Sequence, residues 1–448
     1  MHADVIVIGA GLAGLACALT LKESGLEPLV VEAADQVGGR VRSDRRDGFL
    51  LDRGFQVLQT WYPEARRFLD YGRLDLRPFY PGALVRAGGH THRVSDVWRR
   101  PLRFPEMLLS PVGTTADKLR LLRLRRDCLA GDLEALYARP DRPALDLLRE
   151  LGFSERMLER FFKPFFSGVF FEPDLACSSR AFAFVFRAFA LGDTALPARG
   201  MEEIPSQLAA RLPPGCIRLG CRVDRLMDRQ VLLESGERLG ARALVIATPG
   251  REAARLLGHP EERPVHVSHR GTTCLYFSAE RPPVTGPYLV LNGEAPGAKI
   301  QGPVNSLLCP SNLSEHYAPP QRALVTVNCH GSDHNPDALE TAVRAQVAGW
   351  FGRQVEHWER LAVYRLPEAL PAQRPPVPYP AAVPQRRSDR HWVCGEYGSA
   401  PSIHWALHSG RRAGAEIARA LLGRTDGQGA TGLGPPPGPG SRDRSERL

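Results

Sequence analysis

Apolar and polar positions at the amino terminus follow the order strand, glycine-rich turn, helix, strand. Asp4 to Ile8 is an apolar, β-branched run that predicts a short buried strand. Leu12 to Ser24 predicts a helix that ends at Gly25, and Leu29 to Val31 predicts a second buried strand. This order is typical of the first unit of a parallel α/β sheet.

The rest of the chain alternates between helical and strand-like stretches. Ala83 to Val94 predicts a hairpin that turns at Gly88-Gly89, and mostly helical sequence follows to Leu191. Strand patterns then occur at Arg218 to Val223, Val231 to Glu234, Ala243 to Thr248, Thr272 to Phe277, Ala323 to Cys329 and His391 to Cys394. Helices are predicted near Ala338 to Trp350 and over Ile403 to Leu422.

Two of these patterns decide the predicted domain organisation. Ala243 to Thr248 is apolar throughout and predicts a central strand that rejoins the first sheet. Seven prolines between Pro367 and Pro384 predict an extended connector with little regular structure. The chain therefore leaves the amino-terminal domain twice and returns twice. The predicted division is 1–78, 200–256 and 385–422 for a cofactor domain, 79–199 and 257–384 for a substrate domain, and 423–448 for a disordered tail.

The first turn carries a dinucleotide-binding fingerprint. Gly9 allows a tight strand-to-helix turn, Gly11 allows backbone to approach a pyrophosphate, and Gly14 allows close packing of the helix. The N–H groups at the helix start attract phosphate. Glu32, at the end of the second strand, is placed to accept hydrogen bonds from a ribose diol.

The fingerprint alone fits either NAD or FAD. Its extension, Glu32 followed after five residues by Gly38-Gly39-Arg40, favours FAD. We therefore expect FAD, with NAD as the alternative cofactor.

Composition narrows the class of protein further. The 448 residues, 43% of them hydrophobic and 24% charged, suit a globular protein with a core for two or three domains. Nine scattered cysteines, an odd number without a C-x-x-C pair, favour a reducing compartment and argue against a metal site. A strand so close to the amino terminus leaves no room for a signal peptide, and no run of 18 apolar residues occurs. We expect a cytoplasmic protein.

The net charge is +9, and eight of the basic residues form a basic zone. It contains Arg99, Arg100, Arg103, Lys118, Arg120, Arg123, Arg125 and Arg126. The zone is consistent with a solvated helix face or with peripheral contact to a membrane surface. We expect no nucleic acid partner, because no aromatic residues are interleaved for base stacking.

The chain resembles the superfamily of FAD-dependent flavin amine oxidases, phytoene desaturases and protoporphyrinogen oxidases. The resemblance is carried by Gly9 to Leu15 (GAGLAGL), Glu32 to Arg40 and Cys394 to Ile403 (CGEYGSAPSI). The block from Phe161 to Phe186 looks most like the desaturase branch. The resemblance implies a Rossmann-like FAD-binding domain of the glutathione-reductase type with an inserted mixed α+β substrate domain.

The resemblance also implies which residues hold noncovalent FAD. Arg40 would neutralise the pyrophosphate, Gly54 to Gln56 would lie beside the isoalloxazine ring, and Val223 would meet the adenine. Glu396 stands where many relatives have aspartate, and the last helix would point its start at the flavin. The full predicted set is Gly9, Ala10, Gly11, Leu12, Ala13, Gly14, Glu32, Ala33, Gly39, Arg40, Gly54, Phe55, Gln56, Val223, Thr248, Gly395, Glu396, Ser402 and Ile403.

The substrate side is suggested by phenylalanine density, since eleven of the 18 phenylalanines lie between Phe153 and Phe189. They fit either a packed aromatic core or an apolar tunnel for a long lipophilic substrate. We expect dehydrogenation of an isoprenoid- or carotenoid-like substrate by hydride transfer to flavin N5, with O2 or a quinone as acceptor. A flavin amine oxidase, a flavin-bound polyene isomerase and a noncatalytic carrier remain alternatives.

Candidate catalytic groups are few. The family lysine near flavin N5 has Lys299 as its candidate here, and no cysteine between Cys329 and Cys394 offers a covalent flavin anchor. His404 and His408, one helical turn apart, are either a proton carrier or structural residues. The sequence names no catalytic residue.

Overall fold

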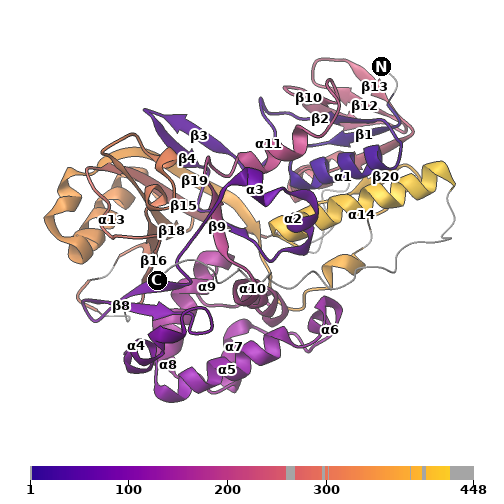
Figure 1. Ribbon diagram of the computed structural model, residues 1–448. Helices are drawn as coiled ribbons and strands as arrows, with labels where there is room; N and C mark the ends of the chain where they lie inside the picture. The colour runs from indigo at the N-terminus through magenta and orange to yellow at the C-terminus, as the bar shows by residue number, and fades with distance from the viewer. Residues whose placement is uncertain are drawn as a thin grey trace, which may run out of the picture.

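The computed structural model describes residues 3–258, 268–294, 298–300, 302–383, 385–395 and 400–423. It has three regions (Figure 1): a parallel sheet with two long helices, an antiparallel sheet covered by α13 (Pro336–Phe351), and a group of helices below both. Within the described residues, no helix combines the length and apolar character needed to cross a bilayer.

The parallel sheet has the strand order β10-β2-β1-β14-β20, and every neighbouring pair is parallel. Its strands are β1 (Val5–Ile8), β2 (Pro28–Val31), β10 (Ile217–Arg218), β14 (Ala243–Ile246) and β20 (His391–Val393). The apolar runs of β1, β2 and β14 are buried throughout because both faces of the sheet are covered. The predicted α/β class is confirmed, as is the return of the chain to this sheet.

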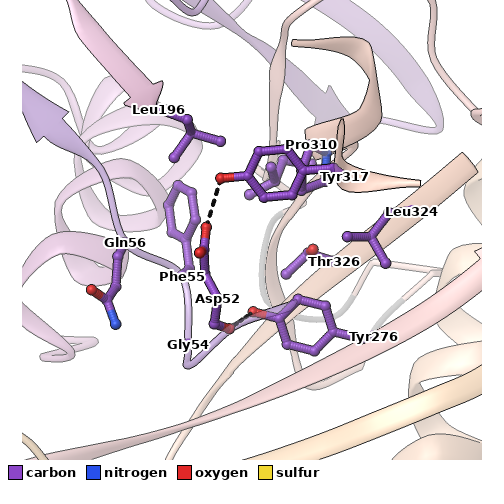
Figure 2. A pocket seen from close by; sticks show the side chains of 11 residues that line it. Asp52, Gly54, Phe55, Gln56, Leu196, Tyr276, Pro310, Tyr317, Leu324 and Thr326 are labelled. Atoms are coloured by element: carbon purple, nitrogen blue, oxygen red, sulfur yellow. Dashed lines mark hydrogen bonds between the residues drawn. The ribbon is translucent and has the colours of Figure 1, made fainter. Parts of the chain in front are cut away.

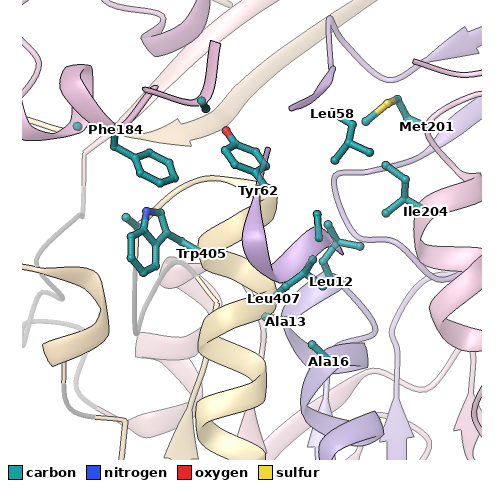
Figure 3. Packing of buried hydrophobic residues seen from close by; sticks show 14 of the residues in the cluster. Leu12, Ala13, Ala16, Leu58, Tyr62, Phe184, Met201, Ile204, Trp405 and Leu407 are labelled. Atoms are coloured by element: carbon teal, nitrogen blue, oxygen red, sulfur yellow. The ribbon is translucent and has the colours of Figure 1, made fainter. Parts of the chain in front are cut away.

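Helices α1 (Leu12–Glu23) and α14 (Ile403–Leu422) lie side by side against this sheet (Figure 1). Nine of the 12 residues of α1 are buried because the helix is held between the sheet and α14. Smaller helices, α2 (Pro63–Phe68), α3 (Tyr71–Leu74), α11 (Glu203–Ala209) and α12 (Gly250–Leu257), complete this region. The core joins α1, α14, α2 and α11 through the residues in Figure 3.

Both excursions from the parallel sheet contribute to one seven-stranded sheet of order β19-β15-β18-β17-β16-β7-β8. The strands are β7 (Gly82–Ala87), β8 (His90–Ser95), β15 (His269–Ala279), β16 (Leu289–Asn292), β17 (Val304–Leu308), β18 (Ala323–His330) and β19 (Glu359–Pro371). The predicted hairpin turns at Gly88 and Gly89, whose φ angles are +61° and +76°. Strand β7 then pairs in parallel with β16, which joins the two excursions.

The predicted irregular connector from Pro367 to Pro384 is wrong for its first five residues. Residues 367–371 continue β19, which pairs with β15. The ladder tolerates these prolines because Pro367 falls where the register shifts and Pro371 ends the strand, so neither leaves a gap in regular pairing.

The helical region consists of α4 (Phe104–Leu109), α5 (Thr115–Leu129), α6 (Leu133–Tyr137), α7 (Ala144–Glu150), α8 (Glu155–Met157), α9 (Lys163–Phe170) and α10 (Ser179–Leu191). The phenylalanine block forms α9, α10 and the turn before them. Phe166 packs against Phe182 with ring centroids 4.5 Å apart, and both rings are buried. Arg187 is also buried and donates hydrogen bonds to the carbonyl groups of Cys128, Ala130 and Gly131. The buried rings of this block therefore form a packed aromatic core.

Three small sheets lie around the parallel sheet. Their strands are β3 (Ser43–Arg46) with β4 (Phe49–Asp52), β5 (Leu58–Gln59) and β6 (Leu76–Pro78) on either side of β9 (Thr194–Pro197), and β11 (Val223–Leu226), β12 (Gln230–Leu233) and β13 (Arg238–Gly240). Because β9 pairs with β5 and β6, this sheet crosses the predicted domain division, which stays a prediction. The predicted disordered tail begins at Gly423, and its residues after Gly423 lie outside the described ranges.

Candidate functional site

The glycine-rich turn is closed tightly on its protein side and open on the other. A Cβ on Gly14 would lie 1.9 Å from the carbonyl oxygen of Gly9, and one on Gly9 would lie 2.9 Å from that of Ala247. Gly9 also has a φ of +107°, which favours glycine. A Cβ on Gly11, in contrast, would meet no atom within 4 Å. The turn therefore leaves free space in front of Gly11.

Groups suited to a phosphate anion lie around the glycine-rich turn. Helix α1 begins at Leu12 with no side-chain cap and no acidic residue in its first turn. Its first N–H groups therefore have no partner within the helix and attract an anion. The Oγ1 atom of Thr248, just beyond β14, is buried and has no hydrogen-bond partner among the described residues.

Glu32 is anchored beside the turn with its carboxylate held at both oxygens. It accepts hydrogen bonds from the N–H groups of Ala10 at 2.7 Å and Ala34 at 2.8 Å. The N–H group of Cys221 donates to the Glu32 carbonyl oxygen at 2.7 Å, which brings Val223, the first residue of β11, to the end of β2. The predicted ribose and adenine residues thus lie together, and Ala33 is exposed beside them.

The second fingerprint lies directly against the first. The N–H group of Gly38 donates to the carbonyl oxygen of Ala10 at 2.9 Å, and a Cβ on Gly39 would lie 3.4 Å from the Cα of Gly11. The Nε2 atom of Gln56 donates to the carbonyl oxygen of Arg40 at 2.8 Å, which links this loop to Gly54 to Gln56. The Arg40 guanidinium donates to the carbonyl group of Ala369 at 3.1 Å, so its pyrophosphate role stays a prediction.

The carboxy-terminal motif meets the amino-terminal turn. A Cβ on Gly395 would lie 3.5 Å from the Cβ of Ala13. The N–H group of Gly395 donates to the Ser409 Oγ atom at 3.0 Å, which fixes this loop to α14. Ser402 caps α14 by accepting a hydrogen bond from the N–H group of Trp405. The predicted residue Glu396 lies outside the described residues, as does Tyr397.

A cavity opens beside the segment predicted to contact the ring of the cofactor (Figure 2). The centre of a water molecule can reach only about 10 Å³ of it, so the cavity is narrow. It is lined by Asp52, Gly54, Phe55, Gln56, Leu196, Tyr276, Leu308, Pro310, Tyr317, Leu324 and Thr326. Of the phenylalanines, Phe55 lines it, whereas those of the dense block do not.

Asp52 is the carboxylate in this lining, and its oxygens are already engaged. One oxygen accepts hydrogen bonds from the Ser43 hydroxyl and the N–H group of Met201, and the other from the Tyr317 hydroxyl at 2.9 Å. The Tyr276 hydroxyl donates to the backbone carbonyl of Asp52 (Figure 2). Burial raises the pKa of Asp52, while its three donors act in the opposite direction. Asp52 therefore holds the tyrosines and the adjacent loop in place.

One wall of the cavity is formed by alternate residues on strands of the antiparallel sheet. Tyr276 on β15 lies opposite Thr326 on β18, and Leu324 and Leu308 extend the same face. The Thr326 Oγ1 atom is buried and has no partner among the described residues. These lining residues were not predicted from the sequence, although alternation along Thr272 to Phe277 and Ala323 to Cys329 was a signal for them.

His404 lies in an aromatic cluster with Tyr62, Phe184 and Trp405 at the start of α14. Its Nδ1 atom accepts a hydrogen bond from the N–H group of Glu64 at 3.4 Å. Burial lowers the pKa of His404 to about 3 and that of His408 to about 4. Both rings are therefore neutral at pH 7, which favours the structural interpretation of this pair.

The candidate lysine, Lys299, and the last cysteine of the chain, Cys394, do not line the cavity. Lys299 is exposed, and the next residue, Ile300, packs against Gly349 of α13. Cys394 faces Cys17 of α1, whose pKa it raises together with burial. Among the described residues, no group of three or more histidine, cysteine, aspartate or glutamate side chains is arranged to hold a metal ion.

Comparisons with known proteins identify one family. A family model described as flavin containing amine oxidoreductase matches residues 12–418. The chain is 36% identical over 102 residues to a coproporphyrinogen III oxidase of Propionibacterium freudenreichii, a match covering 23% of this chain and 18% of that protein. It is 27% identical over 261 residues to polyamine oxidase 2 of Arabidopsis thaliana, covering 55% and 51%. The matches thus span at most about half of these two curated relatives.

Similarity in structure extends over almost the whole chain. The cyclohexylamine oxidase of Brevibacterium oxydans superposes with a TM-score of 0.67 at 18% identity. The match covers 94% of this chain and all of that one. At this identity the likeness shows the fold.

Proposed function

Because the chain belongs to the flavin-containing amine oxidoreductase family and is an FAD-dependent oxidoreductase, we propose that it binds FAD noncovalently and desaturates a lipophilic, isoprenoid- or carotenoid-like substrate. The family match supports the flavin. The proposals of noncovalent binding and of the substrate class rest on the chain's own residues.

The residues around the glycine turn fit FAD. The free space before Gly11, the open start of α1 and the unpartnered Thr248 hydroxyl suit a pyrophosphate, and Glu32 suits a ribose. Gly395 borders the same turn, because it lies against Ala13 of α1. Noncovalent binding is supported by Cys394, the last cysteine in the sequence before α14, because its side chain faces Cys17.

The proposed substrate class rests on one observation, the residues that line the cavity. Leucine, proline, phenylalanine and tyrosine side chains supply most of it, and such a surface favours an apolar ligand. An ammonium group bound there would need an anionic partner, and the Asp52 oxygens are already shared among three donors. The lining therefore favours an apolar substrate over a charged amine.

The protein's part in the reaction is orientation and exclusion of water. When bound, the flavin would supply the acceptor for a hydride from one substrate C–H bond, and the proton from the adjacent carbon would leave to solvent. Tyr276 and Tyr317, held by Asp52, fix the shape of the cavity opposite Phe55 (Figure 2). The Thr326 hydroxyl is free to hydrogen-bond a polar end of the substrate. We expect O2 or a quinone to take the electrons in a separate step.

The test is anaerobic mixing of the purified, FAD-loaded protein with isoprenoid polyenes, alkylamines and a porphyrinogen. Bleaching of flavin absorbance by a polyene, with a product lighter by two hydrogens, is the expected result. An unchanged product mass would instead indicate isomerisation. Release of all yellow colour into the supernatant after acid precipitation is expected for noncovalent FAD.

Amine oxidation is the second candidate, favoured by the similarity to polyamine oxidase 2 and by the two tyrosine rings of the cavity. Aromatic rings attract cations through their faces. Rapid bleaching by an alkylamine and none by a polyene would replace desaturation with amine oxidation.

A further inference from the structure

Large apolar side chains are exposed together on one part of the molecule. Of the ten large hydrophobic residues exposed among the described residues, seven lie between Trp98 and Leu122. They are Trp98, Leu102, Phe104, Leu108, Leu109, Leu119 and Leu122. Leu102 and Leu109 are 93% and 84% exposed, so they contact almost nothing within the chain. An exposed apolar group of this size marks an interaction surface.

These side chains belong to one face because its two segments are tied together. Lys118 of α5 donates to the carbonyl groups of Leu108 and Ser110, which holds the end of α4 against the start of α5. At the other end, the Arg125 guanidinium lies 4.5 Å from the centre of the Trp98 ring. Figure 1 shows α4 and α5 at the edge of the molecule opposite the parallel sheet.

Positive charge is mixed with the apolar side chains. Residues 98–127 contain eight arginine and lysine residues and three acidic residues, Glu106, Asp117 and Asp127. Arg103 pairs with Glu106, and Arg123 and Arg126 both pair with Asp127 at the surface. Asp117 is completely buried, where it accepts hydrogen bonds from Thr114 and Ser154. The side chains of Arg123 and Arg126 are 66% and 76% exposed. The face therefore presents exposed leucines within a net positive field.

We propose that this face, defined by Leu102, Phe104, Leu109, Leu119 and Leu122 with Arg100, Arg103, Arg123 and Arg126, docks the protein on an anionic lipid bilayer. Insertion of the leucines into the interface removes them from water, and the arginines meet lipid phosphate. A second copy of this chain fits poorly, because a twofold contact would place the arginines of both copies against each other.

The proposal is tested by flotation of the full-length, FAD-loaded protein with vesicles. Vesicles of phosphatidylcholine with phosphatidylglycerol are compared with vesicles of phosphatidylcholine alone. We expect the protein to float with the anionic vesicles and to be released as salt is raised, because salt screens the charges. The assay needs no substrate, so it is independent of the proposed desaturation.

Two double variants separate the apolar and charged contributions. Leu102→Ser with Leu109→Ser is expected to lower partitioning by about tenfold or more, because two exposed leucines leave the bilayer. Arg103→Glu with Arg123→Glu is expected to abolish the preference for anionic vesicles. Leu219→Ser and Arg353→Glu, exposed positions elsewhere, are the matched controls and should float like the wild type.

Equal flotation of the leucine variant and the wild type would overturn the proposal, as would a wild type that stays in solution. Sedimentation of the same samples without lipid detects the competing occupant. Conversion of a dimer to a monomer by the leucine variant, with flotation unchanged, would assign the face to self-association. Retained flavin absorbance and an unchanged unfolding temperature show that each variant is folded.

Discussion

The Cα atom of Gly410 on α14 lies against the backbone of Ala13 on α1, so that a Cβ on Gly410 would be 2.0 Å from the Ala13 carbonyl oxygen. One turn later, a Cβ on Gly414 would be 2.9 Å from the carbonyl oxygen of Cys17. The two ends of the chain therefore meet through bare backbone. This contact runs α14 parallel to α1 and carries the first two turns of α14, about seven residues, beyond the start of α1.

Gly410→Ala should therefore destabilise the protein. Alanine favours a helix over glycine by about 1 kcal/mol, but forcing a methyl group into close-packed backbone costs about 1–3 kcal/mol or more. We expect a net loss in the free energy of unfolding by urea, accompanied by weaker FAD retention. Ala420→Ser, which adds one atom on the exposed end of the same helix, should leave both unchanged. An unchanged unfolding midpoint for Gly410→Ala would contradict the close contact.

Gly11→Ala should separate cofactor binding from folding. The Cβ would meet no protein atom within 4 Å, and Gly11 has an ordinary φ of −71°, so the unfolding free energy should stay within about 0.5 kcal/mol of the wild type. The methyl group would fill the space expected for the pyrophosphate, so the purified protein should contain little FAD. Gly14→Ala, which clashes with the Gly9 carbonyl, should lose both stability and FAD. Normal FAD content in Gly11→Ala would place the cofactor elsewhere.

Tyr317→Phe should weaken the cavity by removing a donor from Asp52. A buried carboxylate that loses one hydrogen bond costs about 1–3 kcal/mol. Burial raises the pKa of Asp52 above the value of about 3.9 found in unfolded chains. The contribution of Asp52 to stability is therefore complete below about pH 3.9 and is lost as the pH rises through the pKa of the folded protein. The cost of Tyr317→Phe should therefore be larger at pH 7 than near pH 4, as measured by urea unfolding.

Tyr276→Phe is the control for that experiment. The Tyr276 hydroxyl donates to the backbone carbonyl of Asp52 and not to its carboxylate, so its loss should cost about 1 kcal/mol at both pH values. Identical pH profiles for the two variants would show that Tyr317 does not act through the carboxylate.

His404 should contribute to loss of stability in acid. Burial lowers its pKa to about 3 and that of His408 to about 4, whereas each histidine titrates near pH 6.5 in the unfolded chain. Stability from these neutral rings is therefore complete above about pH 6.5 and falls by up to about 1.4 kcal/mol per pH unit for each ring as the pH drops toward 4. The charged neighbours of His404 are Glu64 and Arg411, which form an ion pair with each other.

His404→Gln should flatten this profile between about pH 6.5 and 4, because one titrating ring is gone. The measurement is the free energy of unfolding by urea at several pH values. His357→Gln, at an exposed position, should keep the wild-type slope. A variant at position 404 with the wild-type slope would mean that His404 is already charged in the fold.

Local sequence patterns were enough to predict most of the elements of the parallel sheet and the residues proposed to hold the cofactor. The apolar run before Gly9, the helix after Gly11 and the last helix over Ile403 to Leu422 follow from short-range patterns, because glycine, capping and periodicity act within a few residues. The same signals located Glu32 and Gly38 to Arg40, which the structure brings against the turn.

The residues that line the proposed substrate cavity could not be predicted, because long-range contacts assemble them. Tyr276, Thr326 and Tyr317 are far apart in sequence and gather around Asp52 because strand pairing brings them together. The role of the phenylalanine block could not be predicted for the same reason. Its composition fits a packed core or a tunnel equally, and only side-chain packing distinguishes the two. Residues 367–371 became strand because β15 offers an edge to pair with, a long-range partner that local proline content does not reveal.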